Sequence, residues 1–137
     1  MSRRAQRTRR VLALQEQLHQ VQHWKLLELQ RQAADLDAQR IELIAALNAC
    51  DALQDLFVEA TARRLRSIAR AADAVAREQL KQAVRVGEEA RRLARAERLS
   101  RRVDREAAGA GEKQALLDVI DRLVGATTPA SRKIAAS

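Results

Sequence analysis

The 137-residue sequence contains few of the residues that build an ordinary globular core or interrupt a helix. Trp24 and Phe57 are its only aromatic residues apart from histidine, and Tyr is absent. One Pro and four Gly leave long stretches in which nothing breaks a helix. Ala, Leu, Arg, Gln and Glu dominate instead, which is typical of a long helix or a coiled coil. The composition therefore predicts an all-α protein without a conventional core.

The chain has one cysteine and no long apolar run. Cys50 cannot form an intramolecular disulfide, so a reducing cytoplasm is expected, with this thiol as a small core residue. The uncharged run at residues 43–50 is far shorter than the roughly 20 residues of a transmembrane helix. The basic start MSRRAQRTRR has the charge of a signal peptide, but residues 15–17 (Gln, Glu, Gln) interrupt any apolar region after it.

Motifs of catalysis and cofactor binding are absent from the sequence. There is no Gly-rich phosphate loop, nucleophile elbow or paired-Cys metal motif. His19 and His23 share a helix face, which is half of a zinc site, but two ligands at this spacing are common by chance and a polar flank is the favoured interpretation. We expect no enzymatic activity, no cofactor, no metal and no small-molecule substrate.

Residues 11–57 contain neither Gly nor Pro and carry one apolar stripe at steps of three or four residues. Two consecutive steps of four, from Val21 through Lys25 to Leu29, create an eleven-residue interval from Leu18 that predicts a weakly twisted helix. The polar residues of this stripe either fix the register of the paired helices or extend their side chains away from a loosely packed helix contact. The stripe consists of Val11, Leu14, Leu18, Val21, Lys25, Leu29, Gln32, Leu36, Arg40, Leu43, Leu47, Cys50, Gln54 and Phe57.

Charge is divided unevenly along the chain. Residues 1–10 carry +5, residues 11–61 carry −5, residues 62–105 carry +8, and residues 106–137 are balanced. An acidic first helix followed by a basic second helix favours folding back into a hairpin over a parallel homodimer.

The predicted fold is a long antiparallel two-helix coiled-coil hairpin with a short C-terminal helix. We expect helices over residues 9–58 and 66–108, with Thr8 as an N-cap and the turn between 58 and 68. Residues 107–111 (AAGAG) predict a break, followed by a helix over 112–124, so that 1–125 form one domain and 126–137 a disordered tail. One continuous helix from 9 to 108 also satisfies the local propensities. The second arm's stripe is Ile68, Ala72, Val75, Gln79, Ala83, Val86, Ala90, Leu93 and Val103.

Four clusters of Arg, within residues 3–10, 63–66, 91–98 and 101–105, have the charge needed to contact phosphates. No aromatic residue lies among them to stack on bases, and Glu or Asp lies near many of them. A solvated face of a helix pair is therefore favoured over a nucleic-acid interface.

The whole layout resembles a known family. A basic start runs into a long coiled-coil helix, and a basic second helix ends in ERLSRRVDREAAGAGEKQALLDVIDRL. This resembles the FliJ family of flagellar type III export, with the YscO-like stalk proteins of injectisomes as close relatives. Glu112-Lys113-Gln114, Leu117-Asp118 and Asp121 are similar to the acidic C-terminal segment of that family, which contains Gln and Lys.

The resemblance implies a cytoplasmic stalk, peripheral to the inner membrane, that couples a hexameric export ATPase to the export gate and escorts export chaperones. The ATPase would contact Arg9, Arg10, Val11, Leu14, Leu116, Val119, Ile120 and Leu123. The export gate and chaperones would contact Leu43, Leu47, Phe57, Arg63, Arg66 and Arg70. A basic coiled-coil nucleic-acid binder and a homo-oligomeric coiled-coil scaffold are the alternatives.

Overall fold

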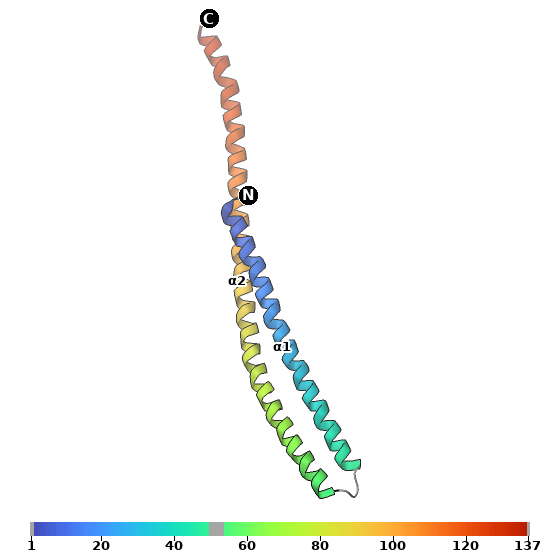
Figure 1. Ribbon diagram of the computed structural model, residues 1–137. Coiled ribbons are helices and arrows are strands. Elements are labelled where there is room, and N and C mark those ends of the chain that lie inside the picture. Colours follow the sequence, from blue (N-terminus) through green and yellow to red (C-terminus); the bar gives the residue numbers. More distant parts are fainter. Residues whose placement is uncertain (1, 50–53, 137) are drawn as a thin grey trace. The chain divides into compact units, whose positions relative to one another are not determined.

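Two long helices pack against each other in the computed structural model, which describes residues 2–49 and 54–136 (Figure 1). Helix α1 spans Arg3–Ala49 and helix α2 spans Gln54–Ala136. The chain divides into two compact units: unit 1 comprises Met1–Ala13 and Ala94–Ser137, and unit 2 comprises Leu14–Leu93. The predicted all-α fold is confirmed at this level.

Helix α1 begins at Arg3 because Ser2 caps it. The Ser2 hydroxyl Oγ accepts a hydrogen bond from the Ala5 backbone N–H at 3.1 Å, which satisfies a donor that the first helical turn leaves open. Thr8, the predicted cap, lies inside the helix and donates its hydroxyl to the Ala5 carbonyl at 2.9 Å. The predicted start at residue 9 is therefore wrong by six residues.

The turn predicted between 58 and 68 is also wrong. Helix α1 ends at Ala49, and residues 54–68 are helical. Within the predicted turn, Thr61 is only 5% exposed and packs between the helices. The change of charge sign near residue 61 therefore does not coincide with the end of a helix. Residues 50–53, with Cys50 among them, lie outside the described residues.

The predicted break at 107–111 does not occur, since α2 continues through it to Ala136. No described Gly has a positive φ, so Gly109 and Gly111 keep helical geometry. The two Gly cost roughly 1 kcal/mol each relative to Ala, which the long helical flanks on both sides outweigh. The short helix 112–124 is therefore part of α2, and the tail expected to be disordered is helical as far as Ala136.

A regular seam of half-buried and buried side chains runs along both helices, and we use the word seam for these positions. Steps of three and four residues alternate, with one gap at Arg40, which is exposed. In unit 1 the seam residues are Ala5, Thr8 and Leu12 of α1, with Ala96, Ser100, Val103 and Ala107 of α2. In unit 2 they are Gln15, His19, Gln22, Leu26, Leu29, Ala33, Leu36, Leu43 and Leu47 of α1, with Thr61, Leu65, Ile68, Ala72, Val75, Gln79, Gln82, Val86, Glu89 and Leu93 of α2.

The seam agrees with the predicted stripe in α2 except at Ala83 and Ala90, which are exposed while Gln82 and Glu89 take the covered positions. In the first third of α1 the seam and the predicted stripe do not agree. Val11, Leu14, Leu18 and Val21 were predicted to be covered, yet they are 38–54% exposed. Gln15, His19 and Gln22 take the covered positions instead. Because the seam keeps its three-four alternation there, the predicted eleven-residue interval is not part of the helix contact.

Polar contacts hold the seam at defined points. In unit 2, Gln82 is 3% exposed, and its Nε2 donates at 2.8 Å to both the backbone carbonyl and the side-chain Oε1 of Gln22. In unit 1, Arg4 pairs with Glu106 at 3.5 Å and Arg9 with Asp104 at 3.6 Å. In both ion pairs the base comes from the basic residues 1–10 of α1 and the acid from α2, so neither pair tests the predicted attraction between residues 11–61 and residues 62–105.

Candidate interaction surfaces

A row of arginines lies on α2 in unit 1, and we call it the basic surface. Arg95, Arg98, Arg101, Arg102 and Arg105 line a hollow of about 810 Å³ together with Leu99 and Asp104. Four of these Arg residues follow each other at steps of three, four and three, so they share one side of the helix. Asp104 also pairs with Arg9. The hollow therefore presents five guanidinium groups, whose planar donor pattern suits carboxylates and phosphates.

A smaller basic hollow lies on α1 in the same unit. Arg3, Gln6, Arg7 and Arg10 line about 300 Å³. Unit 1 holds fourteen Lys and Arg against six Asp and Glu, which gives +8, whereas unit 2 holds twelve of each. The net charge of the whole protein is thus carried by unit 1. Its surface attracts acidic groups over about a Debye length, near 8 Å at physiological salt.

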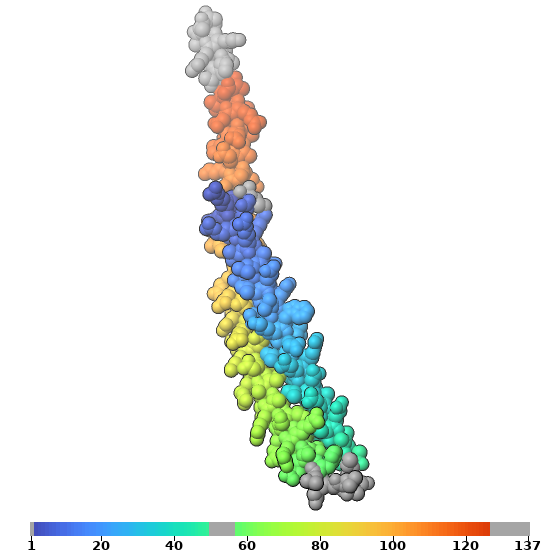
Figure 2. All heavy atoms as spheres, viewed as in Figure 1, coloured from blue at the N-terminus to red at the C-terminus, as the bar shows by residue number. Residues whose placement is uncertain are grey.

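An apolar surface follows the basic one along α2 in unit 1. Every described side chain from residue 108 to 126 is exposed. Figure 2 shows the orange to red part of α2 from about residue 112 onward with no α1 atoms over the face drawn. Large apolar side chains at 44–63% exposure lie at helical spacing, and exposure of this kind marks an interaction surface. They are Leu116, Leu117, Val119, Ile120, Leu123 and Val124.

Seven of the eight residues predicted to contact an ATPase belong to unit 1. Arg9, Arg10 and Val11 come from α1, where Arg9 pairs with Asp104. The other four lie on the exposed apolar part of α2. Leu14 belongs to unit 2 and is 54% exposed. The four α2 residues are Leu116, Val119, Ile120 and Leu123.

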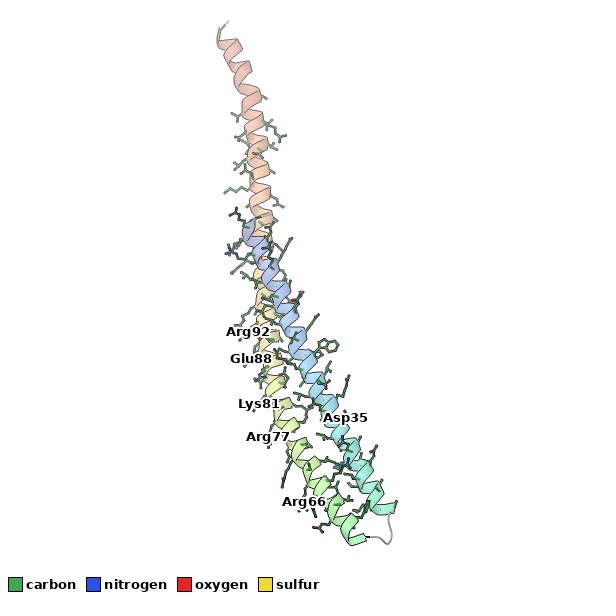
Figure 3. All side chains as sticks on the ribbon, in the orientation of Figure 1. Asp35, Arg66, Arg77, Lys81, Glu88 and Arg92 are labelled. Atoms are coloured by element: carbon green, nitrogen blue, oxygen red, sulfur yellow. The ribbon has the colours of Figure 1, made fainter. Side chains whose placement is uncertain are left out.

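All six residues predicted to contact the export gate and chaperones lie in unit 2. Leu43 and Leu47 are half-buried in the seam, which limits what they offer to a partner. Phe57 is 40% exposed, and Arg63 pairs with Glu59 at 3.0 Å on the same helix. Arg66 and Arg70 are exposed. Figure 3 labels Arg66 among the charged side chains that unit 2 carries on both helices, with Asp35 from α1 and Arg77, Lys81, Glu88 and Arg92 from α2.

The seam holds three polar atoms without hydrogen-bond partners, all in unit 2. They are Oε1 of Gln15, Nδ1 of His19 and Oε2 of Glu89. A buried polar atom without a partner costs about 1–3 kcal/mol of desolvation. His19 and His23 do not belong to a larger metal-ligating group, since residues 2–49 and 54–136 contain no cluster of three or more His, Cys, Asp or Glu. The sequence reasoning left Gln15, His19 and Glu89 outside the predicted stripes, with Leu14, Leu18 and Ala90 between the helices instead, and it interpreted His19 as part of a polar flank.

Neither described helix includes a stretch with the length and hydropathy needed to cross a membrane. Comparisons of this chain with protein-family models, with curated proteins and with solved structures give no match. The function is therefore inferred from the surfaces themselves.

Proposed function

We propose that this protein is a non-enzymatic stalk of a type III protein export apparatus, flagellar or injectisomal. In this proposal α1 and α2 form an antiparallel coiled-coil hairpin in the cytoplasm, peripheral to the inner membrane. It couples the hexameric export ATPase to the export gate and escorts export chaperones. The alternating steps of the seam on both helices support the coiled coil. In unit 1, Arg4 pairs with Glu106 and Arg9 with Asp104, so residue numbers rise on α1 as they fall on α2, which supports the antiparallel direction.

The observation that carries the proposal is the combination of surfaces on α2 in unit 1. The basic surface at 95–105 is followed on the same helix by the exposed apolar residues 116–124. Guanidinium groups recognise acidic side chains, while apolar side chains gain from burial in a partner. This pairing suits docking into a protein ring with an acidic and apolar lining.

Point variants in the full chain test the ATPase contact. Leu116→Glu with Ile120→Glu places two charges on the exposed apolar part of α2, and we expect it to abolish stimulation of the export ATPase from the same cell. Leu80→Glu with Val84→Glu is the matched control, because these residues have the same spacing on α2, are 72% and 58% exposed and lie in unit 2. The control should stimulate normally.

Removal of residues 112–137 is the stronger perturbation. It should also abolish stimulation, while circular dichroism shows that α1 and the remaining part of α2 stay helical. Full stimulation by either the truncated chain or the Leu116→Glu, Ile120→Glu variant would refute the proposed ATPase contact.

The five-arginine hollow favours one second candidate, a basic coiled-coil nucleic-acid binder. This function predicts binding to duplex DNA or RNA that weakens steeply with salt, with a slope of about 0.9 per phosphate contacted. Arg98→Gln with Arg102→Gln should then reduce the slope. Absence of micromolar binding at low salt would eliminate this candidate.

A further inference from the structure

A row of apolar side chains lies exposed on α1 beside the polar part of the seam. Leu14, Leu18 and Val21 are 54%, 38% and 48% exposed. Their spacing of four and three residues places them on one side of α1, and all three belong to unit 2. We call these three residues the outer row.

Helix α2 does not cover the outer row, because the α1 side of the seam here consists of Gln15, His19 and Gln22. Consecutive residues are about 100° apart around a helix, so the outer row faces about 100° away from the seam. An apolar arc of this kind beside an existing helix contact is what a helix needs to bury against a further element.

The sequence of the outer row is self-complementary. At the same spacing it continues to Val11, and the four residues read Val, Leu, Leu, Val with intervals of three, four and three. If two such rows meet in opposite directions, Leu14 faces Leu18 and Val11 faces Val21 of the other copy. A two-fold interface requires this matching of one surface with itself.

Charges that flank the row in the sequence select the antiparallel direction. Positions equidistant from its centre bring Arg4 opposite Glu28 and Arg7 opposite Lys25. The first two attract, in competition with the exposed ion pairs Arg4–Glu106 and Arg31–Glu28 of the same chain, and the last two repel. A parallel, in-register pair would place each of these four charges opposite its own copy, so all of them would repel. Arg7 and Lys25 have long side chains that can point away from each other. The antiparallel arrangement is therefore favoured.

We propose that a second copy of this chain docks on the outer row, so that the protein self-associates as a two-fold dimer through α1 with the two rows antiparallel. This inference does not rest on the proposed role in export, because it uses no residue of the basic surface or of 116–124, although Val11 and Leu14 are also among the residues expected to contact the ATPase.

The first test is the oligomeric state of the full chain by sedimentation equilibrium between about 1 μM and 1 mM, the range of weak self-association. Leu18→Glu should weaken the dimer at least about tenfold, since the symmetry places the new charge twice in the apolar contact. Leu80→Glu is the matched control, since Leu80 is 72% exposed on α2, and it should leave the dimer unchanged. Circular dichroism establishes that both variants remain helical.

A gain-of-affinity variant protects the test against misfolding. Lys25→Glu replaces the repulsion from Arg7 with an attraction at two symmetric places, and we expect the dimer to tighten about three- to tenfold. Loss of affinity in this variant would contradict the antiparallel arrangement. A wild-type chain that stays monomeric up to about 1 mM would overturn the proposal and leave the outer row to a different protein.

Cysteine cross-linking tests the direction. In a Cys50→Ser chain, Val11→Cys and Val21→Cys variants should form a disulfide when mixed, because the two positions face each other. Val21→Cys alone should cross-link poorly, since its own copies would be about ten residues apart along the helices, roughly 15 Å. Efficient cross-linking of Val21→Cys with itself would instead indicate a parallel pair and refute the proposed geometry.

Discussion

Replacement of Gln82 by Ala is the sharpest test of the helix contact in unit 2. Gln82 is 3% exposed, and its Nε2 donates to both the carbonyl and the Oε1 of Gln22 at 2.8 Å. A typical intramolecular hydrogen bond contributes about 0.5–1.5 kcal/mol net. Two lost bonds therefore predict a destabilisation of about 1–3 kcal/mol, with a further contribution from the space left in the seam.

Gln22→Ala separates the two hydrogen bonds. It removes the Oε1 acceptor but keeps the carbonyl, so it should cost only about 0.5–1.5 kcal/mol. Because Ala is a slightly better helix former than Gln, both values are reduced by a similar few tenths of a kcal/mol. The double variant should cost less than the sum of the singles, since the side-chain bond is lost only once.

Urea unfolding followed by circular dichroism at 222 nm measures all three variants, with an unchanged m value as the sign that the unfolding transition is the same. The argument fails if Gln22→Ala destabilises the protein as much as Gln82→Ala, or if the two effects add fully. Either result would mean that Gln82 is not held by the contacts described.

Three further predictions concern the seam, the N-terminal cap of α1 and the two glycines inside α2. Ile68→Ala, at a seam position that is 6% exposed, should destabilise the protein by about 2–4 kcal/mol, whereas Ile41→Ala at 55% exposure should change stability by less than about 1 kcal/mol in the same urea assay. Ser2→Ala should cost about 1 kcal/mol through loss of the cap, and Ser2→Asp should restore it. Gly109→Ala with Gly111→Ala should raise helicity and stability by about 0.5–1 kcal/mol each, since an added Cβ meets nothing within 4 Å at either position; a loss of stability would mean that the chain breaks there after all.

The pattern of apolar residues predicted most of the seam of α2, with errors at Ala83 and Ala90, but misplaced the seam in the first third of α1. In α2, Ile68, Val75 and Leu93 are both apolar and correctly spaced, so hydropathy and phase agree. In α1, a search for apolar residues picks Leu14 and Leu18. The side of the helix on which Leu26 and Leu29 lie carries different residues in this stretch. Counting back from Leu26 along the same side of α1, in steps of four and three residues, leads to Gln22, His19 and Gln15. The helix contact thus stays on one continuous side of α1 even where the residues there are polar. A count of apolar residues alone does not detect such a contact.

The ends of the helices were hard to predict for a different reason. Residues 107–111 contain two Gly, which a local propensity scale treats as a break, but the propensities of long helical flanks outweigh about 2 kcal/mol. The connection after Ala49 contains neither Gly nor Pro to mark it. For the candidate surfaces, the Arg clusters and the covered positions of Leu43 and Leu47 were visible in the sequence, whereas the hollow at 95–105 depends on how the arginine side chains are arranged around α2.

The region of α1 from Leu14 to Gln22 combines two opposite properties. Its seam side is polar, with one well-formed contact to Gln82 and unsatisfied atoms at Gln15 and His19, so it adds little hydrophobic stabilisation to the helix pair. Its outer side carries apolar area that the rest of unit 2 does not cover. A polar pair inside a coiled coil fixes register at the expense of stability. Any partner that binds only the folded pair recovers that stability, because binding to the native state shifts the folding equilibrium towards it. Dimer formation on the outer row and helix pairing along the seam are therefore thermodynamically coupled: each strengthens the other.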